Sequence, residues 1–168
     1  MNKKEAKKIV EELMQLKSCI LTDPSRYLGH IEKVSRMAGN YAFELFCLGY
    51  KIDPSEMEAV GYLHDIGKCF AASYRHGCDF HEFVGGRMLE LMGHQREADI
   101  IRRHGQAYEK LRLLTDEDLE GGVVNPKDYI PNSLESMLLW LVDINSLNIE
   151  KRQIINPRRY EKWAIFLN

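Results

Sequence analysis

The chain has 168 residues, of which 45% are hydrophobic and 29% charged, and its formal net charge is −2. This size allows one domain with a proper core, and the balanced charge argues against a broad basic surface for duplex nucleic acid. The four cysteines form no CxxC pair and no apolar run has the length of a signal peptide or membrane span, so we expect a cytoplasmic protein with reduced thiols, no cysteine-rich zinc site and no membrane segment.

The first predicted element is an amphipathic packing helix over residues 3–20, with apolar residues at helical spacing: Ile9, Leu13, Leu16 and Ile20. A second helix is expected to begin at Asp23-Pro24, which supplies an N-cap and a proline at the first helical position. Its apolar stripe advances by three or four residues through Tyr27, His30, Val34, Met37, Tyr41 and Leu45. His30 is therefore predicted to face the core.

A third helix is predicted to start at the capping box Asp53-Pro54-Ser55-Glu56 and to end near Gly67. It carries His64 and Asp65 side by side on an otherwise apolar stretch. A carboxylate withdrawn from water costs on the order of several kcal/mol unless it is paired, hydrogen-bonded or bound to a metal. Because no Lys or Arg closely precedes Asp65, a cation is its expected partner.

Further helices are predicted in the second half of the chain. The pattern Asp79-Phe80-His81-Glu82 resembles another capping box, with His81 in the first turn of a helix that stops near Gly93. A short helix over residues 95–104 is expected to carry His104 near its carboxyl end. Residues 105–131 are predicted to form a mostly irregular excursion that partly covers the site, with an alternating pattern only over 122–130.

The last core helix is expected to be capped by Asn132 with Glu135, and its apolar run is broken only by Asp143. These elements predict the all-α fold class, in a single domain over residues 1–168 without internal repeats. Residues 149–168 are expected to be a C-terminal packing segment. That segment and the first helix are also the surfaces through which a homodimer could form.

The residues with metal-binding chemistry lie on or beside these helices, and they are His30, His64, Asp65, His81, His104 and Asp143. A single histidine on an apolar face is more often a core residue than a ligand, but the combination favours a metal centre. Imidazole and carboxylate ligands together suit iron, manganese or zinc. Since the set exceeds what one tetrahedral ion needs, we predict two divalent metal ions that share one aspartate.

These positions, with Leu63-His64-Asp65-Ile66 and the following Gly67-Lys68, resemble the HD-domain superfamily of metal-dependent phosphohydrolases over about residues 23–148. The resemblance implies an HD-domain helical bundle with a metal centre in its core. Members with the two additional histidines hold a dinuclear centre, often of iron. The ligands implied are His30, His64, Asp65 and Asp143 for one ion, and Asp65, His81 and His104 for the other.

The segment from Ser25 to Val34 looks like the opening of the bacterial HD-type dinucleoside tetraphosphate hydrolases, in which an arginine, here Arg26, precedes the first ligand by one helical turn. The resemblance implies hydrolysis of a small nucleotide-type phosphoester or phosphoanhydride, such as a dinucleoside polyphosphate, by metal-activated water. Asp65 and Lys68 are the candidate catalytic residues. Lys68 and Arg26 are the candidate phosphate-binding residues.

Two alternative functions stay open. Some HD-domain proteins that resemble inositol oxygenase use the same six ligands for a mixed-valence di-iron pair that activates dioxygen. A non-catalytic nucleotide-binding module is the other alternative, against which the complete ligand set argues. Iron is the first choice of metal, with manganese, nickel, zinc and cobalt as alternatives. His76 and His94 are assigned to the surface, although His76 could replace His81 as a ligand.

Overall fold

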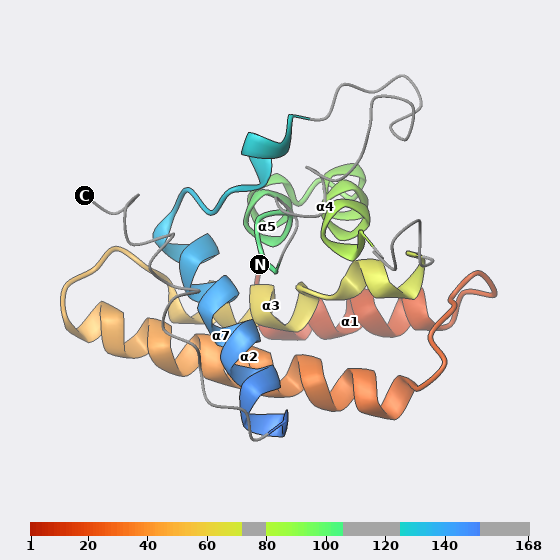
Figure 1. Ribbon diagram of the computed structural model, residues 1–168, viewed down its shortest axis with the longest axis horizontal. Coiled ribbons are helices and arrows are strands. Elements are labelled where there is room, and N and C mark those ends of the chain that lie inside the picture. The colour runs from red at the N-terminus through yellow and green to blue at the C-terminus, as the bar shows by residue number, and fades with distance from the viewer. Residues whose placement is uncertain (72–79, 106–124, 152–168) are drawn as a thin grey trace.

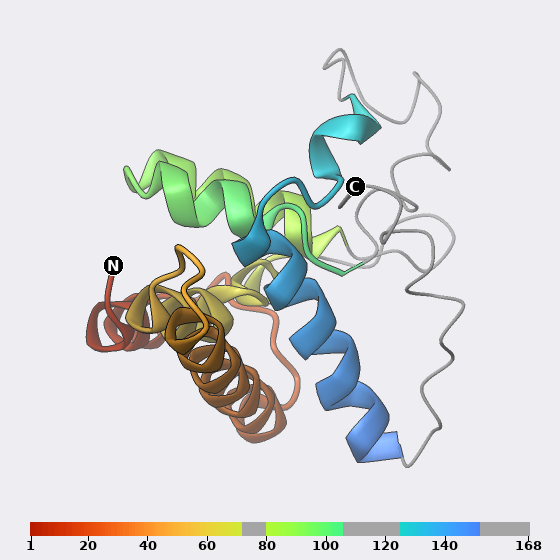
Figure 2. The same cartoon turned by 90° about the vertical axis from the view of Figure 1, so that its left-hand side faces the viewer.

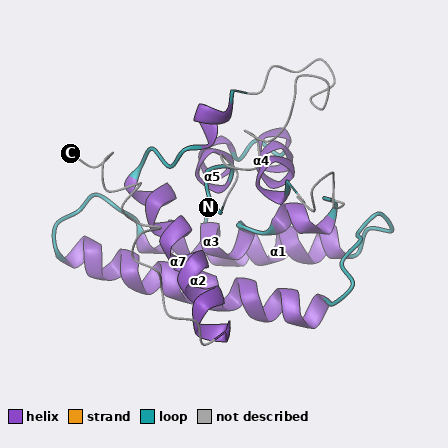
Figure 3. Ribbon diagram, viewed as in Figure 1, coloured by secondary structure: helices purple, strands orange, loops and turns teal. Residues whose placement is uncertain are grey.

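The computed structural model describes residues 1–71, 80–105 and 125–151. Across these ranges all regular structure is helical and no strand occurs, which confirms the predicted all-α class (Figure 3). The α-helices (α) and 3₁₀ helices (η) are α1 Lys3–Met14, α2 Pro24–Cys47, α3 Pro54–Leu63, η1 Ile66–Cys69, α4 His81–Leu91, α5 Gln95–Ile101, η3 Pro126–Tyr129 and α7 Leu134–Lys151.

The longest helix, α2, lies along the base of the view in Figure 1, with α3 packed against it and α1 packed against α3. Helices α4 and α5 pack against each other on the other side of α3, and α7 crosses α2 (Figures 1 and 2). The largest fully buried apolar side chains between these helices are Ile31, Met57, Leu63, Ile66, Leu89, Ile101 and Leu139. The core is therefore continuous through the centre of the fold.

Two glycines allow unusually close backbone contacts. A Cβ atom at Gly61 would lie 2.8 Å from the Cα atom of Ser35, so α3 approaches α2 without an intervening side chain. A Cβ atom at Gly67 would lie 2.0 Å from the carbonyl oxygen of His81, which brings η1 into direct backbone contact with the start of α4. Only glycine fits such approaches, and the second one draws Asp65 towards His81.

Two predicted helix starts are confirmed. Asp23 is the N-cap of α2, where its side chain accepts a hydrogen bond of 3.0 Å from the amide of Arg26. Asp53 is the N-cap of α3 and accepts from the amide of Ser55 at 2.8 Å. In both cases an aspartate satisfies an amide that has no partner inside its helix, and the following proline fits the first helical position.

Two predicted helix ends are wrong. Helix α1 stops at Met14 instead of continuing to residue 20, and the side chains of Leu16 and Ile20 are about half exposed. After the helix the chain turns, with the amide of Leu16 bound to the carbonyl of Leu13, and the amide of Ile20 donates a 2.8 Å hydrogen bond to the carbonyl of Cys69. Helix α3 ends at Leu63 instead of near Gly67, since residues 66–69 tighten into η1.

The start of α4 is also corrected. Its N-cap is Phe80, in the left-handed region at φ 44°, and no side chain of the described residues forms a capping hydrogen bond there. Asp79, the predicted cap, lies outside the described residues. Glu82, the predicted partner in the capping box, is instead buried with a relative exposure of 1%.

The start of α7 is made by two serines and not by Asn132 with Glu135. The Oγ atom of Ser133 accepts a hydrogen bond of 3.2 Å from the amide of Ser136, whose own hydroxyl accepts from the amide of Asn132 at 3.1 Å. Glu135 pairs with Arg96 of α5 at 3.0 Å. Because Glu135 binds Arg96 of the neighbouring helix, it does not form the predicted cap.

Part of the predicted irregular excursion is described. Residues 126–129 form η3, so the alternation over 122–130 does not mark a strand there. The rest of the excursion, residues 106–124, and the C-terminal packing segment beyond Lys151 lie outside the described residues. So does His76, whereas His94 is half-buried at the N-cap of α5.

The carboxyl end of α2 and the turn after it are unusually apolar at the surface, with exposed side chains at Tyr41, Phe43, Phe46, Leu48 and Tyr50. Tyr41 was predicted to belong to the core stripe, but it is 44% exposed because buried alanines at positions 38 and 42 form the inner face at this point. No helix in the described part of the chain is long and apolar enough to cross a bilayer.

Candidate metal centre

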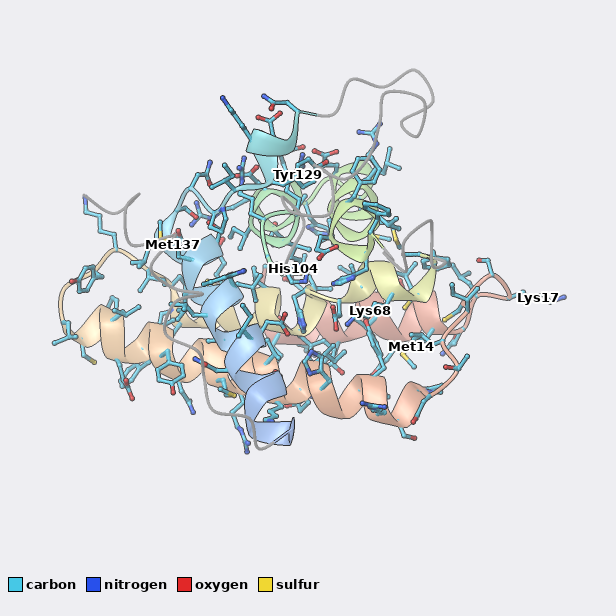
Figure 4. All side chains as sticks on the ribbon, viewed as in Figure 1. Met14, Lys17, Lys68, His104, Tyr129 and Met137 are labelled. Atoms are coloured by element: carbon cyan, nitrogen blue, oxygen red, sulfur yellow. The ribbon has the colours of Figure 1, made fainter. Side chains whose placement is uncertain are left out.

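The structure brings together the side chains of His30, His64, Asp65, His81, His104 and Asp143. They come from five parts of the fold: the first half of α2, the junction of α3 with η1, the first residue of α4, the turn after α5, and α7. His104, which is fully buried, lies near the middle of the molecule in Figure 4, where Lys68 is also labelled. Polar groups so far from solvent need partners.

One half of the cluster surrounds Oδ2 of Asp65. The Nε2 atoms of His30 and His64 each lie 3.4 Å from this oxygen and 3.1 Å from each other. Oδ1 of Asp143 approaches the same two nitrogens at 3.3 and 3.5 Å. Two imidazole nitrogens and two carboxylate oxygens thus converge on one point between α2, α3 and α7.

The other half of the cluster surrounds Oδ1 of the same aspartate. Nε2 of His81 lies 3.0 Å from Oδ1 of Asp65, and Nε2 of His104 lies 3.8 Å from it. The two Nε2 atoms are 3.2 Å apart. Each oxygen of Asp65 therefore faces its own pair of histidines, and this carboxylate is the only group of the set shared in this way among the described contacts.

Backbone carbonyls orient two of the four imidazole rings. Nδ1 of His64 donates to the carbonyl of Gly61 at 2.8 Å, and Nδ1 of His104 donates to the carbonyl of Ile101 at 2.5 Å. With the proton on Nδ1, the lone pair of Nε2 points to the centre of the cluster. This arrangement is typical of metal-binding histidines, whose second nitrogen is held by an outer hydrogen bond.

The cluster has a strongly negative electrostatic character. Burial lowers the pKa of His64, but the charges and hydrogen bonds of Asp65 and Asp143 outweigh burial and raise the pKa to about 10. Burial raises the pKa of both carboxyl groups, yet the surrounding histidines hold the pKa of each well below its ordinary value. Positive charge is therefore strongly favoured between these side chains.

The distances fit metal coordination. Metal bonds to nitrogen and oxygen of about 2.0–2.2 Å place neighbouring ligand atoms of one ion about 2.9–3.6 Å apart. The separations within the first half, 3.1 to 3.5 Å, fall in that interval. In the second half, Nε2 of His81 lies within that interval from both Oδ1 of Asp65, at 3.0 Å, and Nε2 of His104, at 3.2 Å. The distance from Nε2 of His104 to Oδ1 of Asp65, 3.8 Å, is slightly longer. These His and Asp groups could therefore hold a metal ion.

A pocket of about 480 Å³ reaches the cluster, and it is lined by Leu21, Arg26, Tyr27, Gly29, His30, Asp65 and Lys68. Lys68 extends to it from η1, and its Nζ lies 2.5 Å from Oδ2 of Asp65. Arg26 contributes from the first turn of α2. Both predicted phosphate-binding residues thus line the same pocket as two members of the cluster, His30 and Asp65.

Two neighbours of the cluster were not identified from the sequence. Tyr27 was assigned only to a packing stripe, but it also lines the pocket. Glu82 was interpreted as part of a helix cap, but its carboxylate is buried beside His81, with 3.6 Å between Oε2 and Nδ1. The adjacency of Glu82 to a candidate ligand was a usable signal, whereas nothing in the local pattern distinguishes Tyr27 from other apolar positions.

The chain is similar to an uncharacterized protein of Methanocaldococcus jannaschii, with 32% identity over 115 residues. The match covers 68% of this chain and 62% of the relative, so the chain spans less than two thirds of the relative's length. No family model and no solved structure matches the chain.

Proposed function

We propose that this protein is an HD-type dinuclear metal phosphohydrolase whose substrate is a small nucleotide-type phosphoester or phosphoanhydride. The observation that carries the proposal is the carboxylate of Asp65, whose two oxygens face two separate pairs of histidines. The residues that would hold one ion are His30, His64, Asp65 and Asp143. Those that would hold the other are Asp65, His81 and His104.

When bound, two divalent cations supply a water of lowered pKa and stabilise negative charge on a phosphoryl group. Iron is our first choice, because imidazole with carboxylate suits it, and manganese, nickel, zinc and cobalt accept the same ligands. The all-nitrogen-and-oxygen donor set supports this choice over the softer ions that prefer thiolates.

The chain's own contribution to catalysis is to bind and orient the phosphate. The ammonium group of Lys68 is placed at the pocket wall beside Asp65, where it can donate to a phosphate oxygen. The guanidinium group of Arg26, on the same wall, can donate two parallel hydrogen bonds to another phosphate. Two cationic donors along one pocket support a substrate with more than one phosphate, such as a dinucleoside polyphosphate.

The pocket size supports the same substrate class. Pockets for small molecules are generally about 300–1,000 Å³, and the pocket at the cluster, about 480 Å³, lies within that range. Leu21 and Tyr27 give it an apolar part on which a base or sugar can rest. Catalysis by metal-activated water needs no nucleophilic side chain, and neither serine nor cysteine lines the pocket among the described residues.

The experiment that tests the proposal combines metal content by elemental analysis with phosphate release from dinucleoside polyphosphates, mononucleotides and cyclic nucleotides. We compare the natural protein with His81→Ala and with His94→Ala, a matched histidine outside the cluster. Two ions per chain and phosphate release, both reduced in His81→Ala and unchanged in His94→Ala, are expected.

At most one ion per chain, with no phosphate released under any added cation, would overturn the proposal. Two iron ions with dioxygen consumption in place of phosphate release would favour the oxygenase alternative. Nucleotide binding without turnover in the fully loaded protein would favour the binding module.

A further inference from the structure

We infer that Glu82 is a positioning residue that orients His81 and thereby controls ion binding in the half of the cluster formed by His81, His104 and Oδ1 of Asp65. The inference rests on the proposed two-ion centre. Glu82 directly follows His81 in the first turn of α4, and its relative exposure is 1%. A carboxylate withdrawn from water to this extent needs a compensating interaction.

The carboxylate of Glu82 faces the outer nitrogen of His81. Its Oε2 lies 3.6 Å from Nδ1, while Nε2 on the opposite side of the ring faces Oδ1 of Asp65 at 3.0 Å. At 3.6 Å the contact is longer than a hydrogen bond. A negative group on this side favours the tautomer with its proton on Nδ1, which leaves the lone pair of Nε2 free to bind a cation.

The other oxygen of Glu82 lies beside the segment that carries the second histidine. Gly105 directly follows His104 and has φ +65°, and a Cβ atom there would lie 2.8 Å from Oε1 of Glu82. The carbonyl of Gly105 accepts a 2.7 Å hydrogen bond from the indole of Trp140. The carboxyl group of Glu82 thus lies between His81 and the turn after His104, close to both ligand segments of this half.

The two halves differ in their outer contacts. In each half, the outer nitrogen of one histidine, His64 or His104, is held by a neutral backbone carbonyl. The remaining histidines differ: Nδ1 of His30 is buried without a hydrogen-bond partner among the described residues, whereas Nδ1 of His81 faces the carboxyl group of Glu82. Outer partners of this kind change metal affinity by about 10- to 100-fold when they are removed, so loss of the charge of Glu82 should weaken one half selectively.

The test is calorimetric titration of the metal-free protein with Mn²⁺ alone. Glu82→Gln keeps the size and a hydrogen-bond acceptor but removes the charge, and Glu82→Asp keeps the charge on a shorter side chain. Glu90→Gln is the matched control, because Glu90 lies on the same helix but binds Arg87 and Arg102, neither of which is a member of the cluster. Thermal melting of each metal-free variant shows whether the fold is kept.

We expect Glu82→Gln to bind the first ion with natural affinity and the second about 10- to 100-fold more weakly. Glu82→Asp should recover part of the loss, and Glu90→Gln should titrate like the natural protein. Natural affinity for both ions in Glu82→Gln, or equal weakening of both, would overturn the inference while leaving the two-ion proposal intact. A natural protein that binds a single ion would overturn the two together.

Discussion

At the scale of the residue, the contact between Lys68 and Asp65 links the metal cluster to the pocket. The Nζ atom of Lys68 lies 2.5 Å from Oδ2 of Asp65, the same oxygen that faces His30 and His64. A single ammonium group therefore partly neutralises the cluster and also lines the pocket. Removing this ammonium group is therefore expected to have two separate effects, one on substrate binding and one on metal binding.

We predict that Lys68→Met lowers kcat/KM for phosphate release by about 10- to 100-fold, because a hydrogen bond to a charged group contributes about 1.5–3 kcal/mol. The affinity for Mn²⁺ should stay equal or rise, since a competing positive charge is removed from Asp65. Steady-state kinetics and metal titration measure the two effects. Lys8→Met, at an exposed lysine of α1, is the control, and equal kcat/KM in both variants would refute the role of Lys68.

Tyr27 and Glu82 show what a residue pattern can miss. The ligand histidines and aspartates were identified from their chemistry, because a polar group in an apolar run has few explanations. The position of Tyr27 in its helical stripe is explained by packing alone, and its side chain is indeed buried, with a relative exposure of 7%. Only the position of the pocket adds the second role.

At the scale of the element, the cluster depends on how closely η1 approaches α4. The approach is possible because Gly67 has no side chain, and a Cβ atom there would lie 2.0 Å from a backbone oxygen of His81. Backbone cannot move aside as the end of a flexible side chain can. The position of His81 relative to Asp65 is therefore fixed by a residue that has no metal-binding atom.

We predict that Gly67→Ala destabilises the protein by about 1–3 kcal/mol, as overpacking does. It should also weaken the binding of the second metal ion, because the added methyl group pushes His81 away from Asp65. Gly29→Ala is the control, since a Cβ atom at Gly29 meets nothing within 4 Å, and in a helix the exchange should stabilise by up to about 1 kcal/mol. Urea unfolding compares the stability of both variants, and Mn²⁺ titration compares Gly67→Ala with the natural protein. A Gly67→Ala protein as stable as Gly29→Ala would contradict this account.

The starts of α2 and α3 were predicted better than the ends of α1 and α3 for a physical reason. Asp23 and Asp53 bind amides two or three residues further on, so the whole interaction lies within a short stretch of sequence. The segment after α1 instead makes a hydrogen bond between Ile20 and Cys69, which are far apart in the sequence. Periodicity alone carries no information about that partner.

At the scale of the whole molecule, the candidate ligands tie together helices that are distant in the sequence. His30 on α2 and Asp143 on α7 approach to 3.3 Å, while His81 and His104 join α4 to the turn after α5. An ion bound by these side chains binds only the folded chain, so it should add its binding free energy to the stability of the fold.

We predict that removing the metal lowers the melting temperature by about 5–10 °C. An ion present at 100 times its dissociation constant contributes about 2.7 kcal/mol, and each kcal/mol corresponds to about 2–4 °C for a chain of this size. Differential scanning calorimetry before and after chelation, and again after Mn²⁺ is returned, measures the change. An unchanged melting temperature after verified metal removal would show that the cluster is not coupled to folding by an ion.

The sequence by itself determined the all-α class, the starts of α2 and α3, and which side chains have metal-binding chemistry, because capping, periodicity and ligand type are properties of short segments. Only the tertiary structure decided that α1 ends at Met14, that Glu82 turns inward, and that each oxygen of Asp65 faces its own pair of histidines. These features depend on contacts between helices, whose distances and directions are set by packing and cannot be read from local patterns.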